Sequence, residues 1–165
     1  VTRLSAGREA GATRGGIKQA LERIAALRPG PGEGCFVFLT MHGARDAGLV
    51  FEPGGHILTP DSLDAALDRG CGAAPTLVIA SGCYSGNFAV GRMARPNRVV
   101  MTAARADRSS FGCGADHDLT VFDDCLLRGL SAGGAVPAIW PAVTGCVEAE
   151  ERRRGYGPPS GPQLH

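Results

Sequence analysis

The stretch VIASGCYSGNFA, residues 78–89, decides how this sequence is interpreted. Its first residues continue an apolar run that predicts a buried strand over 75–81. The run stops at Ser81, and Cys83 follows in a turn between two glycines. Two interpretations are open at this point. Cys83 is either a small residue in a tight turn or a nucleophile that the strand delivers to the mouth of a site.

Strands and helices alternate on both sides of this stretch, which predicts an α/β fold with a mostly parallel central sheet flanked by helices. The run 35–41 is almost wholly apolar, as expected of a strand covered on both faces. Apolar periodicity and turn residues give the other elements: strand 97–104, hairpin 48–59, and helices 17–28, 59–70, 118–130 and 136–151.

Two details of this assignment concern the second half of the chain. The helix 118–130 has Leu119, Phe122, Leu126 and Leu130 on one face, which predicts that this face is buried. The segment 152–165 is predicted to be an extended, solvated polar tail on a single domain that spans 1–165.

The composition excludes several classes of function. Net charge is +1, so nothing steers the protein toward nucleic acid or anionic membranes. No segment approaches the ~20 apolar residues that a membrane span requires. The N-terminal residues lack the apolar centre of a signal peptide, and the compartment stays open.

Six cysteines are present, and none forms a C-x-x-C pair, which argues against a structural zinc site. Three disulfides are conceivable, but the chain is longer than the small secreted domains that need them. All except Cys83 are therefore predicted to be mostly free, small and buried, as for Cys35 and Cys125.

Three strand ends carry reactive or polar residues: His42-Gly43, Cys83 and the run 107–110. Sites in parallel sheets form beyond the carboxyl ends of the strands. A thiol attacks a carbonyl as thiolate, and histidine titrates in the range needed to take its proton. The backbone N–H groups of Gly43 and Cys83 are suited to hold a developing oxyanion. A structural histidine and a turn cysteine remain an equal alternative from the local pattern alone.

The remaining histidines are weaker candidates. His56 falls in the hairpin, His117 precedes a helix, and His165 ends the tail, so each is expected to be solvated or capping. A metal site from His56, His117 and nearby aspartates has no recognisable spacing, and no metal is predicted.

Taken together, these motifs resemble a known family. A strand ending in His-Gly, followed by a strand ending in S-G-C-Y-S-G, is similar to the caspase-like fold of cysteine peptidases. The block TAARADRSSFGCGADHDLTVF (102–122) resembles the legumain, or asparaginyl endopeptidase, family in a bacterial form, and the late P-S-G-P-Q is a weaker match. The resemblance covers roughly residues 13–163 and implies a three-layer sandwich.

The resemblance also implies roles for individual residues. His42 would be the general acid and base, Cys83 the nucleophile, and the N–H groups of Gly43 and Cys83 the oxyanion hole. The weaker substrate-binding candidates are Ser81, Ser109, Ser110 and Thr120, for which capping and turn roles are equally expected. The family reaction needs no metal or organic cofactor, and its partner is a peptide or protein substrate.

The sequence departs from the family pattern in two places. Ser81 occupies the position where relatives with asparagine preference have an acidic residue. The family's first strand–helix unit has no counterpart, so we expect either an N-terminally truncated, incomplete domain or a sheet that has lost an edge or central strand. A missing central strand would expose apolar surface. Three functions stay open: an active endopeptidase, a caspase-like binding or regulatory domain that no longer cleaves, and a transamidase or ligase that uses the same thioester.

Overall fold

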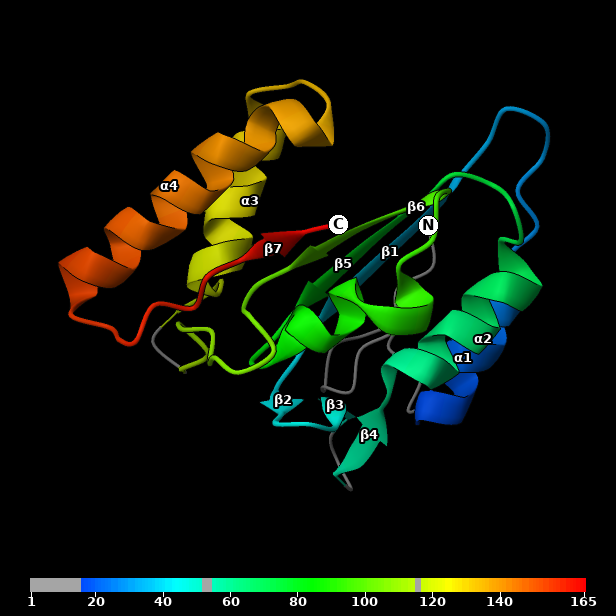
Figure 1. Ribbon diagram of the computed structural model, residues 1–165, viewed down its shortest axis with the longest axis horizontal. Coiled ribbons are helices and arrows are strands. Elements are labelled where there is room, and N and C mark those ends of the chain that lie inside the picture. Colours follow the sequence, from blue (N-terminus) through cyan, green and yellow to red (C-terminus); the bar gives the residue numbers. More distant parts are fainter. Residues whose placement is uncertain (1–15, 52–54, 115–116) are drawn as a thin grey trace.

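The computed structural model describes residues 16–51, 55–114 and 117–165, which form a layered α/β fold (Figure 1). The segment 1–15 and the predicted hairpin tip at 53–54 lie outside the described residues. Two short 3-10 helices, η1 and η2, lie between β5 and β6. The full order is α1 (Ile17–Ala25), β1 (Cys35–Thr40), β2 (Gly43–Ala44), β3 (Gly48–Phe51), β4 (His56–Leu58), α2 (Pro60–Gly70), β5 (Thr76–Ser81), η1 (Ser85–Ala89), η2 (Gly91–Met93), β6 (Arg98–Thr102), α3 (Val121–Ser131), α4 (Val136–Arg154) and β7 (Gln163–Leu164).

The central sheet has the strand order β1-β5-β6-β7. Strands β1, β5 and β6 run parallel, and β7 joins antiparallel to β6, so the predicted mostly parallel sheet is confirmed. A second sheet, β2-β3-β4, lies beyond the carboxyl end of β1 and includes the predicted hairpin (Figure 1).

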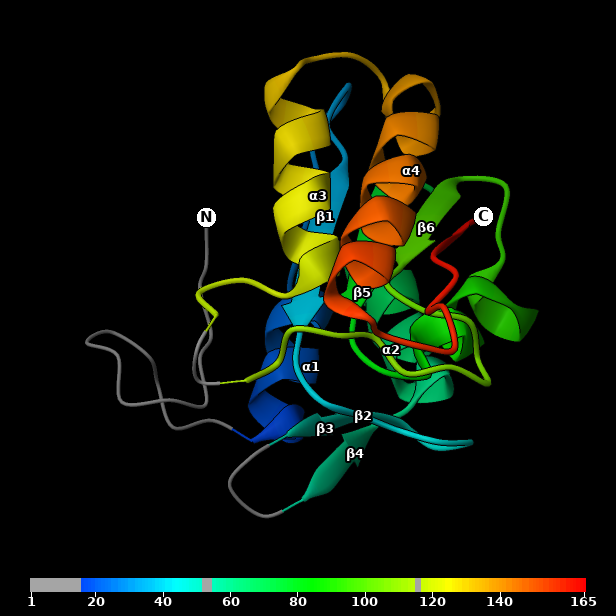
Figure 2. The ribbon, with the colours of Figure 1, turned by 90° about the vertical axis from the view of Figure 1, so that its left-hand side faces the viewer.

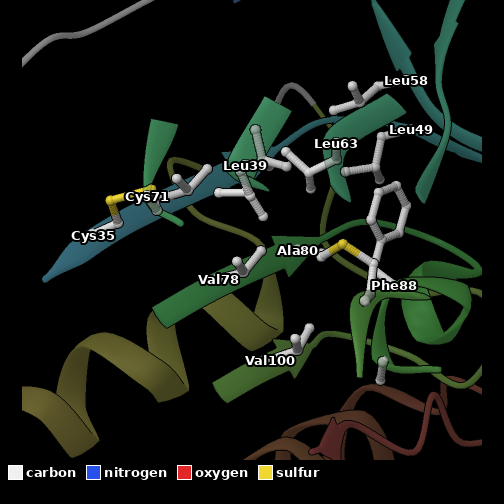
Figure 3. Close-up of a cluster of buried hydrophobic side chains, with 14 residues drawn as sticks. Cys35, Leu39, Leu49, Leu58, Leu63, Cys71, Val78, Ala80, Phe88 and Val100 are labelled. Atoms are coloured by element: carbon white, nitrogen blue, oxygen red, sulfur yellow. A yellow bond between two sulfur atoms is a disulfide. The ribbon is translucent and has the colours of Figure 1, made fainter. Parts of the chain in front are cut away.

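Helices cover both faces of the central sheet (Figures 1 and 2). Helices α1 and α2 pack on one face, and the apolar cluster between them and the sheet is closed at one end by Phe88 and Leu49 (Figure 3). Helices α3 and α4 pack on the other face over Ile79 and Met101. Among the described residues, no helix combines the length and apolarity that crossing a membrane demands.

The prediction that β1 is covered on both faces is wrong. Its burial alternates: Val37 and Leu39 are buried against the α1–α2 layer, whereas Phe36 and Phe38 are 62% and 44% exposed. Helices α3 and α4 cover β5 and β6 on that side but leave the face of β1 open. The apolar side chains on this face explain why the run looked like a doubly covered strand.

The prediction of free, buried cysteines is wrong for four of the five residues it covers, because these four form disulfides, and the fifth, Cys113, is free but exposed. Cys35 at the start of β1 is bonded to Cys71 at the end of α2 (Figure 3). Cys125 on α3 is bonded to Cys146 on α4. Each disulfide therefore ties neighbouring elements together within one layer or between a layer and the sheet. Free cysteines in the described part of the chain are Cys83 and Cys113.

Other predictions need smaller corrections. Phe122 and Leu126 on α3 are buried, but Leu119 and Leu130 are 45% and 42% exposed. The tail is extended but not solvated throughout: it follows α4, buries Ser160 against Glu151, and ends in β7.

A buried ion pair fastens α2 to the start of β6. Arg98 is 1% exposed at its side chain and donates to Asp64 at 2.8 Å, and Arg95 adds hydrogen bonds of 3.0 and 3.1 Å. Burial by itself raises the pKa of Asp64, but the hydrogen bonds from Arg95 and Arg98 outweigh burial and hold this pKa below 3.8. Removing Asp64 leaves the buried guanidinium of Arg98 with only the longer contact, 3.6 Å, to the carboxylate of Asp68, which is 43% exposed.

We expect Asp64→Ala to lower the free energy of unfolding by about 3–5 kcal/mol at pH 7, because the buried guanidinium of Arg98 loses its short ion pair. A carboxylate with a depressed folded-state pKa stabilises the fold above its unfolded value and stops doing so as pH falls through the folded value. The difference between wild type and variant, measured by urea denaturation, should therefore narrow between pH 4 and pH 2. Asp61→Asn, on the exposed side of the same helix, is the control. An equal loss of unfolding free energy in Asp64→Ala at pH 4 and at pH 2 would contradict the ion-pair explanation.

Candidate active site

The register of β1 against β5 places His42 and Cys83 at one edge of the sheet. Thr40 and Ser81 are paired residues in the two strands, and His42 and Cys83 each follow two residues later. His42 is exposed, and Cys83 is partly buried. The edge is therefore open to solvent on the histidine side.

The backbone of Gly43 lies directly against Cys83. A Cβ atom at position 43 would stand 1.8 Å from the Cys83 carbonyl oxygen and 3.1 Å from the Cys83 nitrogen. Val50 donates to the His42 carbonyl at 2.7 Å, so Gly43 and Leu49 form a non-hydrogen-bonded pair of the β2–β3 ladder. This leaves the Gly43 N–H outside that ladder.

The glycines on either side of Cys83 are required by close packing. A Cβ on Gly82 would lie 2.6 Å from both the Met41 carbonyl oxygen and the Leu49 side chain. A Cβ on Gly86 would lie 2.3 Å from the Ala106 nitrogen. Gly82 therefore allows a close approach between neighbouring segments of the chain.

Tyr84 holds the turn in an unusual conformation. Its φ of 57° and ψ of 17° are left-handed, a region that residues other than glycine rarely occupy. The Tyr84 N–H donates to the Arg108 carbonyl at 2.7 Å, and the Ser85 hydroxyl accepts from the Ala104 N–H at 3.2 Å. These bonds to the loop after β6 fix the turn that carries Cys83, and local strain of this kind clusters at functional sites.

The thiol of Cys83 faces the loop after β6. It donates to the Ser110 carbonyl oxygen at 3.5 Å and lies 3.7 Å from the Ser110 hydroxyl. Ser110 also hydrogen-bonds the nearby thiol of Cys113. Partial burial raises the pKa of Cys113, and the charges of the neighbouring Cys83 and Asp123 raise it further. This second thiol is therefore the poorer nucleophile at neutral pH.

A polar cluster beside Cys83 was missed by sequence reasoning. The Ser109 hydroxyl donates to the Tyr84 hydroxyl at 3.3 Å, and the Arg45 guanidinium lies 5.0 Å from the centre of the Tyr84 ring. The hydrogen bond with Ser109 and then Arg45 lower the pKa of Tyr84. The structure thus places Ser109 and Arg45 together beside Cys83. In the sequence, only the position of Arg45 three residues after His42 indicates that it belongs here.

One of the other substrate-binding candidates, Thr120, lines a small cavity of about 200 Å³ between β1 and the start of α3, whereas Ser81 and Ser110 are not among its lining residues. Thr120 lines this cavity and caps α3 by accepting from the Asp123 N–H at 3.0 Å. Thr40, also a lining residue, donates its hydroxyl hydrogen to Asp123 at 2.9 Å. Ser81 is the paired neighbour of Thr40 on β5 and is 1% exposed.

Asp123 is a residue that sequence reasoning passed over, because a carboxylate in the first turn of a helix has an ordinary capping explanation. In the structure Asp123 is 8% exposed and lines the cavity, and its Oδ1 has no hydrogen-bond partner among the described residues. The hydroxyl of Ser81 is likewise buried and unpartnered.

The remaining histidines stay apart from the nucleophile turn. His56 begins β4 and is exposed, and His117 contacts Arg154 of α4 at 3.2 Å. Across residues 16–51, 55–114 and 117–165, no group of three His, Cys, Asp or Glu side chains is arranged to hold a metal ion.

Comparison with known proteins gives two findings. The model of the peptidase C13 family matches residues 14–131. The crystal structure of caspase-1 from Spodoptera frugiperda superposes with a TM-score of 0.63 at 14% identity, covering 90% of this chain and 66% of that one. No curated protein matches the sequence. The caspase match shows the fold, and the family match supports a cysteine peptidase type of function.

We expect Gly43→Ala to disrupt the nucleophile turn, because its Cβ would overlap the Cys83 carbonyl. The rate of Cys83 alkylation by iodoacetamide should change several-fold, and the melting temperature should fall, because the overlap with a backbone oxygen forces the two loops apart. Gly145→Ala is the matched control, since a Cβ there meets nothing within 4 Å. An unchanged rate in Gly43→Ala would show that the contact does not shape the reactivity of the thiol.

Proposed function

Because the chain belongs to the peptidase C13 family, we propose that it hydrolyses peptide bonds with Cys83 as nucleophile and His42 as general acid and base. The observation that carries the proposal is the contact of Gly43 with the backbone of Cys83, at the edge where β1 and β5 end. This contact couples the two loops that bear the dyad.

In the first half of the reaction, the Cys83 thiolate attacks the carbonyl carbon of the scissile peptide bond. The N–H groups of Gly43 and Cys83 hold the oxyanion of the tetrahedral intermediate. No described residue accepts a hydrogen bond from the Cys83 N–H, and the Gly43 N–H lies outside the β2–β3 ladder, so both donors are free to serve. The imidazolium of His42 then protonates the leaving amine, the C–N bond breaks, and a thioester remains.

In the second half, a water molecule gives its proton to the neutral imidazole of His42 and attacks the thioester. The C–S bond breaks, the carboxylic product leaves, and Cys83 returns to the thiolate with His42 protonated. The partner of the protein is thus a peptide or protein substrate, and the groups named are sufficient without a metal or organic cofactor.

The neighbouring free thiol supports Cys83 rather than Cys113 as the nucleophile. Cys113 lies outside the glycine-flanked turn, and its raised pKa keeps it protonated near neutral pH. Cys83 stands next to two backbone donors and to the strained Tyr84. A non-cleaving binding domain is disfavoured because both dyad residues are present, and a transamidase differs only in the amine that replaces water.

We expect a peptide electrophile to label wild type and Cys113→Ser, and to fail with Cys83→Ala. His42→Ala should lower the labelling rate and the rate of peptide hydrolysis by about 10²–10⁴-fold, because the thiol loses its base and the leaving amine its acid. Mass spectrometry of the labelled peptide identifies the modified cysteine.

Each variant is a separate check on the proposed reaction. Labelling that persists in Cys83→Ala would refute the nucleophile assignment, and labelling at the wild-type rate in His42→Ala would refute the dyad. Product analysis with an added amine then distinguishes hydrolysis from transamidation.

A further inference from the structure

One residue that lines the cavity between β1 and the start of α3, Asp123, has a buried polar atom with no partner among the described residues. Oδ1 of Asp123 and the hydroxyl of Ser81 are both buried and lack a hydrogen bond among the described residues. Both lie around Thr40, which donates to the other carboxylate oxygen of Asp123 and is the paired neighbour of Ser81. Buried polar atoms in this state cost about 1–3 kcal/mol each, which a bound group would relieve.

This cavity adjoins the nucleophile. Cys113 lines it and lies close enough to Cys83 and Asp123 for the charges of both to raise its pKa. Ser110 contacts the thiols of both Cys83 and Cys113. A peptide whose carbonyl carbon lies at Cys83 can therefore place the side chain before the scissile bond in the cavity. Its volume of about 200 Å³ is smaller than a typical small-molecule site and suits one side chain.

The lining is rich in hydrogen-bond acceptors and acidic. Among the described lining residues, Asp118 and Asp123 carry the formal negative charges, and there is no lysine or arginine. The Thr40 hydroxyl already donates its hydrogen to Asp123, so only its oxygen is available to a bound side chain, as a hydrogen-bond acceptor. Phe38, 44% exposed, provides an apolar wall.

We propose that this cavity is the primary specificity pocket, and that Asp123 selects substrates with arginine or lysine before the scissile bond. The inference rests on the proposed function. A guanidinium or ammonium group carries donors only, which matches the acceptors of the pocket, and its positive charge neutralises the buried carboxylate. The aliphatic stem of the guest packs on Phe38, and the cation is also attracted by the ring.

An asparagine side chain fits this arrangement less well. Its amide N–H group can satisfy Asp123, and the Thr120 hydroxyl has a hydrogen to donate to its carbonyl oxygen, but the carboxylate would remain without a compensating charge. An acidic side chain would be repelled. Position 81 on β5 holds a serine and not an acidic residue. Asp123 supplies the carboxylate instead, from α3.

The test is a panel of fluorogenic peptides of sequence Ala-Ala-Ala-X, with X as Arg, Lys, Asn, Asp or Ala. We expect kcat/KM for Arg and Lys to exceed that for Ala by about 100-fold, in the range of a buried charge pair. Asp123→Asn should remove most of this preference. Preference for Asn or Asp in wild type, or an Arg and Lys preference that survives in Asp123→Asn, would overturn the proposal.

The matched control is Asp124→Asn. Asp124 is the next residue on α3, is already paired with Arg128, and does not line the cavity. We expect this variant to keep the wild-type preference. A loss of preference equal to that of Asp123→Asn would assign the effect to helix charge and would overturn the role of Asp123.

A second measurement needs no cleavage and no variant. Benzamidine presents an amidinium on an aromatic ring, and benzamide is its neutral counterpart. We expect benzamidine, but not benzamide, to raise the melting temperature of wild type and to protect Cys83 from alkylation. Equal effects of the two compounds would overturn the pocket assignment. If no peptide is hydrolysed but benzamidine binds selectively, the pocket stands and the proposed peptidase activity fails.

Discussion

The parallel pairing of β1 with β5 is the constraint on which the candidate site depends. Its register sets Thr40 beside Ser81, and two residues further along each strand the chain reaches His42 and Cys83. The small sheet β2-β3-β4 then turns back so that Gly43 lies on the backbone of Cys83. A shift of one residue in this register would move His42 away from the nucleophile turn and turn Ser81 to the opposite face. The Cys35–Cys71 disulfide ties the start of β1 to α2, at the end of the strand remote from the site.

Backbone proximity explains the unusual composition around Cys83. Three glycines, at 43, 82 and 86, stand where segments from β1, β3 and the loop after β6 meet with no room for a Cβ. Tyr84 has the left-handed backbone conformation that glycine adopts more easily than other residues. Its side chain contacts Arg45 and Ser109. The turn is thus held by neighbours on three sides, which is the pre-organisation that a nucleophile requires.

The sequence predicts the order of helices and strands well because short apolar runs and punctuating Gly and Pro residues are local signals. It also predicts that Cys83 and Ser110 meet, since the carboxyl ends of parallel strands share one edge, and their contact in the structure confirms this. The approach of the His42 side chain to Cys83 stays a prediction. The disulfides and the exposed face of β1 could not be predicted in the same way. Both depend on which elements become neighbours, and Cys35 or Phe38 has the same local pattern whether or not a partner covers it.

The exposed face of β1 and the proposed specificity pocket have the same physical origin. Helices α3 and α4 are centred over Ile79 and Met101, so they cover β5 and β6 and stop short of β1. Had α3 extended over β1, Phe38 would be buried and the space beside Thr40 and Asp123 would be filled. The incomplete cover instead leaves a cavity next to the nucleophile, bounded by an aromatic ring on one side and a buried carboxylate on the other. In this fold, the edge strand that is least well protected is therefore the one that provides the floor for substrate selection.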